Sequence, residues 1–281
     1  MSAKKKNTNG RIDTTSLVDL INKKAGETLA YDLTKDNPTE VKQWIPTGST
    51  WLNKIICVGN PNGGVPVSKI TELAGLEGSG KSYMAAQIAA NAQKMRIING
   101  MNSRPLEPLA NNQCTLLALN QLKTNITTDR SSLLTEPYVT PGGKALPYSY
   151  SLRIWLTVRK AKASYVVDEH GYKIGSEVKA RIKKSRFGSL GRECTFKILW
   201  GNNVGIQDEE SWFDAIQPSD NLERNGAWYT LMHADGTSEK FQFTKWHEKI
   251  KDEKFRARVL EIMNDVVVQS WGPSKGKAVS S

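Results

Sequence analysis

Cysteine, histidine and long apolar runs are scarce in this sequence, and each shortage excludes a class of protein. The 281 residues include three histidines without metal-ligand spacing, to which we assign ordinary surface or packing roles. No apolar stretch approaches the ~20 residues that span a bilayer, and none follows the basic N-terminus as a signal peptide requires. An odd number of scattered cysteines predicts reduced thiols in a cytoplasmic protein, and these are Cys57, Cys114 and Cys194.

Acidic residues are also few relative to basic ones. Lysine and arginine number 39, against 28 aspartates and glutamates, which gives a net charge of +11. This imbalance favours a nucleic-acid partner, although a generally basic surface without a polyanion partner gives the same count. The hydrophobic content of 38% is typical of a soluble globular protein, and the length suits one large domain with or without small appendages.

The motif that organises the chain is GLEGSGKS at positions 75–82, which fits the phosphate-binding P-loop pattern G-x-x-x-x-G-K-[ST]. Its glycines allow a tight turn that points N–H groups at phosphate oxygens, and the helix that follows adds its positive dipole end. Lys81 is predicted to reach the β and γ phosphates of ATP, and Ser82 to supply one Mg²⁺ ligand. The predicted nucleotide-binding residues are Gly75, Glu77, Gly78, Ser79, Gly80, Lys81, Ser82 and Tyr83.

A glycine-rich turn without a ligand is the alternative interpretation of this motif. The context favours the P-loop, because an apolar strand precedes the motif and an alanine-rich helix follows it.

The rest of the sequence alternates helical and strand patterns and predicts an α/β protein. Residues 17–24 form an amphipathic helix that is too short to be stable alone, so we expect it to dock on a partner surface. The apolar run 114–119 suits a strand buried on both faces of a parallel sheet. Residues 123–147 are long and polar, which is unusual unless the segment is functional. Further elements are expected as helices at 51–56, 83–93, 209–216 and 255–268, and as strands at 152–158, 172–186, 194–200 and 226–231.

Several blocks follow one another in an order that identifies a family. They are the P-loop, TLLALNQLK (115–123), IGSEVKARIKKSR (174–186), FKILWG (196–201) and NGAWY (225–229). With these blocks the chain resembles RecA-type recombinases, and most closely the phage UvsX-like proteins, from about residue 40 to residue 271. The P-loop is shared by many NTPases, whereas the other blocks in this order are more specific.

The resemblance implies a P-loop core sheet preceded by a subunit-docking helix in residues 1–39, a core in 40–271 and a disordered tail in 272–281. It implies a homo-oligomeric filament on single-stranded DNA, with ATP between subunits, and leaves double-stranded DNA open as a partner. Gln121 matches the residue that senses the γ-phosphate, and Lys184 and Arg186 match the basic pair that reaches the neighbour's ATP. The loop at 123–147 matches the DNA-binding loop, with the candidates Lys123, Arg130, Gly142, Gly143 and Lys144.

The sequence departs from the family pattern after the P-loop helix. Hydrolysis needs a carboxylate that orients Mg²⁺ and a group that positions water. The family places further strand–helix units, at ~30 residues each, where this sequence passes from Met95 to Arg96 and soon to the NQL strand. We therefore expect an incomplete core sheet with exposed apolar edges. Asp168 and Glu77 are weak substitutes, because Asp168 is better suited to a hairpin turn and Glu77 is poorly placed to replace both acids.

Three hypotheses remain open from the sequence. The chain is a DNA-dependent ATPase and recombinase in recombination and repair, a non-hydrolysing remnant that binds DNA or joins the filaments of a full-length partner, or a deletion product without stable function. The intact flanking blocks favour the first by classification, and the missing acids favour the others by chemistry.

Overall fold

The computed structural model describes residues 14–26, 30, 40–58, 62–98, 115–126, 137–143, 145–158, 164–200 and 205–269. The chain divides into two compact units, Met1–Lys42 and Gln43–Ser281. The first contains α1 (Thr14–Ala25), so the helix expected at 17–24 is present within wider bounds. Its apolar side chains Leu17, Leu20 and Ile21 are exposed, and what they dock on stays a prediction. Within the described residues no helix is both long and apolar enough to cross a membrane.

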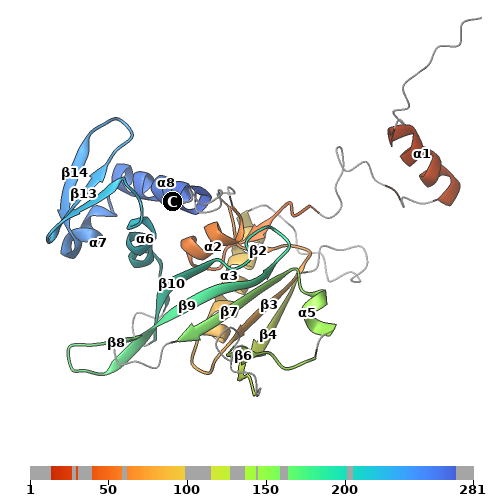
Figure 1. Cartoon of the computed structure of the whole chain (residues 1–281), viewed down its shortest axis with the longest axis horizontal. Coiled ribbons are helices and arrows are strands. Elements are labelled where there is room, and N and C mark those ends of the chain that lie inside the picture. The colour runs from red at the N-terminus through yellow and green to blue at the C-terminus, as the bar shows by residue number, and fades with distance from the viewer. Residues whose placement is uncertain are drawn as a thin grey trace, which may run out of the picture. The chain divides into compact units, whose positions relative to one another are not determined.

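The second unit is built on a central sheet of mixed direction, as Figure 1 shows. Its strand order is β11-β10-β9-β7-β3-β4, with β8 paired to β9. The strand β3 pairs in parallel with both β4 and β7, and the strands beyond β7 are antiparallel. This arrangement confirms the α/β class. The bounds are β3 (Ile70–Gly75), β4 (Leu116–Gln121), β7 (Leu152–Val158), β8 (Tyr165–Val167), β9 (Lys173–Ser185), β10 (Glu193–Leu199) and β11 (Gly205–Gln207).

Two helices cover one face of this sheet. The helix α2 (Thr50–Ile56) begins after Ser49, whose hydroxyl accepts a hydrogen bond from the Leu52 N–H and so caps the helix. The helix α3 (Lys81–Ile98) is rich in alanine, a strong helix former, and packs Met84 and Ile88 against the sheet. Alternating residues of β7, β9 and β10 join this core, including Ile154, Ala180 and Phe196, and β3 contributes Leu73. A short ribbon of β1 (Trp44–Ile45) and β2 (Val65–Pro66) contributes to the same core.

The strand expected to be buried on both faces is instead half exposed. Leu116 and Leu119 of β4 are 54% and 50% exposed. The physical reason is that β4 pairs with β3 on one side only and forms the edge of the sheet among the described residues. The prediction of full burial was wrong. The helix α3 runs through positions 95 and 96 without a break, and the next described residue is Thr115.

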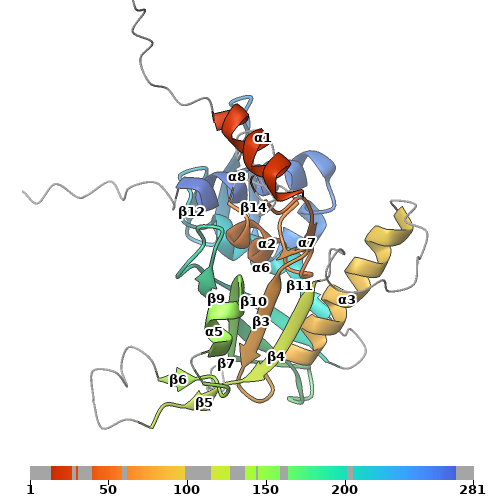
Figure 2. The same cartoon turned by 90° about the vertical axis from the view of Figure 1, so that its right-hand side faces the viewer.

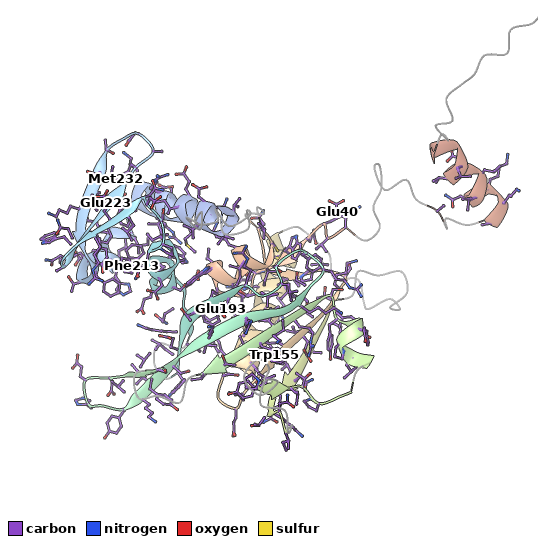
Figure 3. All side chains as sticks on the ribbon, in the orientation of Figure 1. Glu40, Trp155, Glu193, Phe213, Glu223 and Met232 are labelled. Atoms are coloured by element: carbon purple, nitrogen blue, oxygen red, sulfur yellow. The ribbon has the colours of Figure 1, made fainter. Side chains whose placement is uncertain are left out.

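A second hydrophobic cluster lies in the C-terminal part of the chain. The small antiparallel sheet of β12 (Leu222–Asn225), β13 (Trp228–Met232) and β14 (Ser238–Gln242) packs with α6 (Asp208–Ile216) and α8 (Glu253–Gln269). Between β14 and α8 lie a 3-10 turn (Phe243–Lys245) and α7 (Trp246–Lys249). Figure 3 marks Phe213 of this cluster and Trp155 of the central sheet. Asp208 ties the cluster to α2 by accepting a hydrogen bond of 2.7 Å from the Thr50 N–H.

Candidate nucleotide and DNA site

The P-loop closes on itself at the end of β3. The Lys81 Nζ donates a hydrogen bond of 2.6 Å to the Leu76 carbonyl oxygen, and the Ser79 hydroxyl donates one of 2.7 Å to the same oxygen. Gly78 and Gly80 have φ angles of 71° and 77°, which side chains rarely permit. A Cβ at Gly75 would lie 2.4 Å from the Ser79 Oγ and 2.7 Å from the Leu156 carbonyl oxygen, so only glycine fits there. This backbone has the form that a phosphate-binding loop requires.

The side chains around the loop are open to a ligand. Glu77 and Ser82 are exposed, and Tyr83 is half-buried with its hydroxyl 3.4 Å from the Gln87 Oε1. Partial burial lowers the pKa of Lys81, and the negative charge of Glu77 opposes this shift. A cation that is partly desolvated and held by one carbonyl is well suited to exchange that carbonyl for a phosphate oxygen.

Gln121 lies beside the P-loop, as the sequence predicts. The parallel register pairs Gln121 at the end of β4 with Gly75 at the end of β3. The next residue continues the contact, because the Leu122 N–H donates a hydrogen bond of 3.0 Å to the Gly75 carbonyl oxygen. The Gln121 side chain is exposed at the same end of the sheet as Lys81. Two of the predicted site elements therefore meet.

The predicted DNA loop leaves the sheet at this same end. Lys123 is exposed on β5 (Lys123–Thr124), which pairs with β6 (Tyr138–Val139) as a two-stranded ribbon. Figure 2 shows this ribbon at the end of the sheet where the arrowheads of β3 and β4 lie. Gly142 and Gly143 form an exposed turn before α5 (Ala145–Ser149). Arg130 and Lys144 lie outside the described residues.

Lys184 and Arg186 are not brought to the P-loop of their own chain. In the register of β9 with β7, Lys184 lies opposite Arg153 and Ser185 lies opposite Leu152. Leu152 in turn lies opposite Thr71, near the start of β3. Four residue-to-residue steps along the strand lead from Thr71 to Gly75, which is roughly 13 Å. Lys184 and Arg186 therefore lie away from the P-loop end of β3 in their own chain.

The two basic side chains rest on the short helix α5. The Lys184 Nζ donates hydrogen bonds to the carbonyl oxygens of Pro147 (2.6 Å) and Tyr148 (3.2 Å), and Arg186 donates one of 3.2 Å to Tyr148. Desolvation lowers the pKa of Lys184, and the positive charges of Arg186 and Arg153 lower it further.

The face of the sheet away from α2 and α3 carries basic residues from the segment 179–197. Arg181 is exposed there opposite Trp155, and the Lys183 ammonium lies 4.5 Å from the centre of the Trp155 ring. Some of the charge is matched by acids, since Lys179 pairs with Glu193 and Lys197 with Glu210. The segment is therefore a basic strand pair in which Lys179 and Lys197 are matched by acids.

The described residues contain no acid cluster that could take the place of the carboxylates that hydrolysis needs. No group of three or more histidine, cysteine, aspartate or glutamate side chains within the described ranges could hold a metal ion. The Asp168 Oδ1 accepts hydrogen bonds from the N–H groups of His170 and Tyr172, which confirms that Asp168 forms the hairpin turn.

One part of the site was not predicted from the sequence. Glu72 and Arg153 form an ion pair on the face of the sheet that carries Trp155, with Asn120 bonded to the same carboxylate. The available signal was a glutamate inside the otherwise apolar strand KITELAG, because a charge is rarely buried without a partner.

Fold and site together define a P-loop α/β protein whose mixed central sheet has parallel strands, β4, β3 and β7, at the P-loop. The chain is similar to bacterial RecA proteins. It is 27% identical to the protein RecA of Rubrobacter xylanophilus over 190 residues, which cover 66% of this chain and 50% of that protein. It is 26% identical to the protein RecA of Staphylococcus carnosus over 200 residues, covering 69% and 51%. With the protein RecA of Acidothermus cellulolyticus the identity is 30% over 165 residues, covering 58% and 43%.

The chain thus spans about half the length of the curated relatives it matches. No family model matches it. The similarities support a relationship to RecA-type recombinases and are consistent with the core sheet described above.

Proposed function

We propose that this chain binds ATP and single-stranded DNA and acts in homologous recombination and repair, in the manner of RecA-type and phage UvsX-like recombinases. The observation that carries the proposal is the register of Gly75 with Gln121, which puts the P-loop beside the strand that leads into the predicted DNA loop. Lys81 would bind the β and γ phosphates and Ser82 would hold Mg²⁺, which supplies charge neutralisation on the phosphates. The proposal also includes a kinship with UvsX-like phage proteins and a cytoplasmic location in a bacterium or phage-infected cell.

The position of the basic pair supports the proposal of a filament. Lys184 and Arg186 lie at the far end of the sheet from the P-loop of the same chain, and this position supports a role at a neighbour's nucleotide. Cations placed against the γ-phosphate from another subunit would stabilise its developing charge. Assembly with ATP between copies of the chain therefore fits the geometry, with α1 in residues 1–39 as the proposed docking element and 40–271 as the proposed core.

A second candidate function is DNA binding without hydrolysis. The observation that favours it is the pairing of β4 on one side only, together with the lack of an acid cluster among the described residues. We propose that strand–helix units present in longer recombinases are missing after the P-loop helix. The remaining protein would bind DNA through its basic face and loop, without turning ATP over.

ATP hydrolysis by the purified chain separates the two candidates. We would measure turnover with and without single-stranded DNA, beside Lys81→Ala. Turnover that DNA stimulates and Lys81→Ala abolishes establishes the recombinase ATPase and shows that another carboxylate serves. Absence of turnover, with salt-sensitive DNA binding that survives Lys81→Ala, establishes the non-hydrolysing protein. A chain that binds neither ATP nor DNA overturns both.

A further inference from the structure

Glu72 is a buried carboxylate in the middle of the P-loop strand. Its side chain is 1% exposed, and its neighbours on β3 are apolar or glycine apart from Thr71. An unpaired charge in such a position is strongly destabilising, and an apolar residue would often be tolerated better than a buried ion pair. The reason for a carboxylate at this position must therefore lie in the groups that it holds.

The Glu72 carboxylate joins three adjacent strands. Its Oε2 accepts a hydrogen bond of 2.5 Å from the Arg153 Nε, on β7 directly across from Glu72. Its Oε1 accepts one of 3.0 Å from the Asn120 Nδ2 on β4. The Arg153 side chain is 12% exposed, so this pair is well shielded from solvent. Charge-assisted bonds in such surroundings hold both partners in defined orientations.

Both partners of Glu72 then reach the same segment. The Arg153 Nη2 donates a hydrogen bond of 2.8 Å to the Thr140 hydroxyl, and the Asn120 Nδ2 also donates one of 3.2 Å to the Pro141 carbonyl oxygen. Thr140 and Pro141 follow β6, where the predicted DNA loop returns to the core. The Asn120 side chain also bonds its neighbour in the site, since its Oδ1 accepts from the Gln121 N–H.

We propose that Glu72 is a positioning residue that fixes the return of the DNA loop to the P-loop strand. Through Arg153 it holds Thr140, and through Asn120 it holds Pro141 and the backbone of Gln121. Through these contacts, nucleotide binding changes the affinity of the loop for DNA, and DNA binding changes the affinity of the P-loop for nucleotide. The coupling part of this inference rests on the proposed function, whereas the anchoring part does not.

The anchoring is tested without any ligand, by hydrogen exchange of the backbone amides in residues 137–143. Glu72→Gln removes the charge, and we expect exchange of this segment to speed up by about tenfold, as loss of charge-assisted hydrogen bonds implies. Glu223→Gln, which removes one exposed charge from the small C-terminal sheet, should leave it unchanged. Unchanged exchange in folded Glu72→Gln overturns the anchoring.

A second pair of variants separates positioning from stability. Thr140→Val removes only the hydroxyl that Arg153 contacts, and Thr140→Ser restores it. Because the Thr140 side chain bonds to Arg153 rather than to Glu72 and is only half-buried, both variants should fold even if Glu72→Gln does not. Faster exchange in Thr140→Val, with wild-type exchange in Thr140→Ser, supports the anchoring. Equal exchange in the two variants overturns it.

The coupling is measured as the affinity for a fluorescent single-stranded oligonucleotide with and without ATP and Mg²⁺. We expect ATP to change the wild-type affinity by about 5- to 150-fold and the Thr140→Val affinity by less than about twofold, with Thr140→Ser as wild type. ATP affinity without DNA should be equal in all three. A full ATP effect in Thr140→Val overturns the coupling, whereas a wild-type protein that binds neither ligand overturns the proposed function and leaves the exchange result standing.

Discussion

The Lys184 Nζ lies 2.6 Å from the carbonyl oxygen of Pro147, in the helix α5 at the end of the predicted DNA loop. This contact holds the Lys184 side chain against α5 of its own chain, away from the P-loop of that chain. We predict that Lys184→Ala leaves ATP affinity of the dilute chain unchanged. On DNA, where copies assemble, the same variant should weaken ATP binding by about tenfold or more, as loss of a charge-assisted contact implies.

Fluorescence of a labelled ATP analogue, titrated with and without saturating oligonucleotide, measures both affinities. Lys251→Ala is the matched control, because Lys251 is an exposed lysine near the start of α8. An equal loss of ATP affinity in the dilute and the assembled protein would contradict a role in a neighbouring subunit.

Gly75→Ala should abolish nucleotide binding while leaving the fold intact. The added methyl group would meet the Ser79 Oγ at 2.4 Å and the Leu156 carbonyl oxygen at 2.7 Å, so the loop must open. Gly236→Ala is the control, because its Cβ would meet no atom within 4 Å and only the positive φ is strained. Equilibrium dialysis with ATP and circular dichroism provide the two measurements. ATP affinity retained in Gly75→Ala would refute the assignment of the loop.

Arg181→Ala should reduce the salt dependence of DNA binding. If Arg181 neutralises one phosphate, the slope of log affinity against log salt falls by about 1 when it is removed. Lys254→Ala removes an equal charge from α8, where Lys254 pairs with Asp235, and should leave the slope unchanged. Anisotropy of a labelled oligonucleotide across a salt series gives both slopes. Identical slopes for the two variants would show that Arg181 does not contact a DNA phosphate.

Cys57 should make the fold sensitive to alkaline pH. Burial raises the pKa of its thiol from 9.0 to about 12, and the hydrogen bond with Gly64 opposes this shift. The folded state therefore binds the proton more tightly, so stability is full below pH 9 and is lost as pH rises toward 12. Relative to Cys57→Ala, the free energy of unfolding should fall by about 1–2 kcal/mol between about pH 8 and about pH 10.5. Urea titrations at the two pH values measure this, and parallel changes in both proteins would contradict it.

The sequence was most informative where local chemistry determines structure. The glycines of the P-loop and the alanine-rich run after it predict strand, loop and helix, because both signals lie within a few residues of one another. The turn at Asp168 is likewise local, since its carboxylate bonds the N–H groups of the following residues. Alternation identified β7 and β9 for the same reason.

Features that depend on distant partners were missed. The run at 114–119 is apolar enough for a central strand, but its exposure is decided by whether another strand joins β4. Glu72 interrupts the apolar pattern of its strand, and the reason is visible only in the fold, where Arg153, 81 positions later, bonds to its carboxylate. The strands β12 and β14 are short and polar, and they are strands because β13 pairs with both.

The two edges of the central sheet, as the described residues define them, differ in how another strand could pair with them. One ends in β11, three residues long and antiparallel, and the other ends in β4, six residues long and parallel to β3. Because β4 runs toward Gln121, any strand that adds to it in parallel finishes its course next to the P-loop. Among the described residues the outer side of β4 has no strand partner, so a strand added there would bring new side chains to the end of the sheet that carries Gln121 and Lys81.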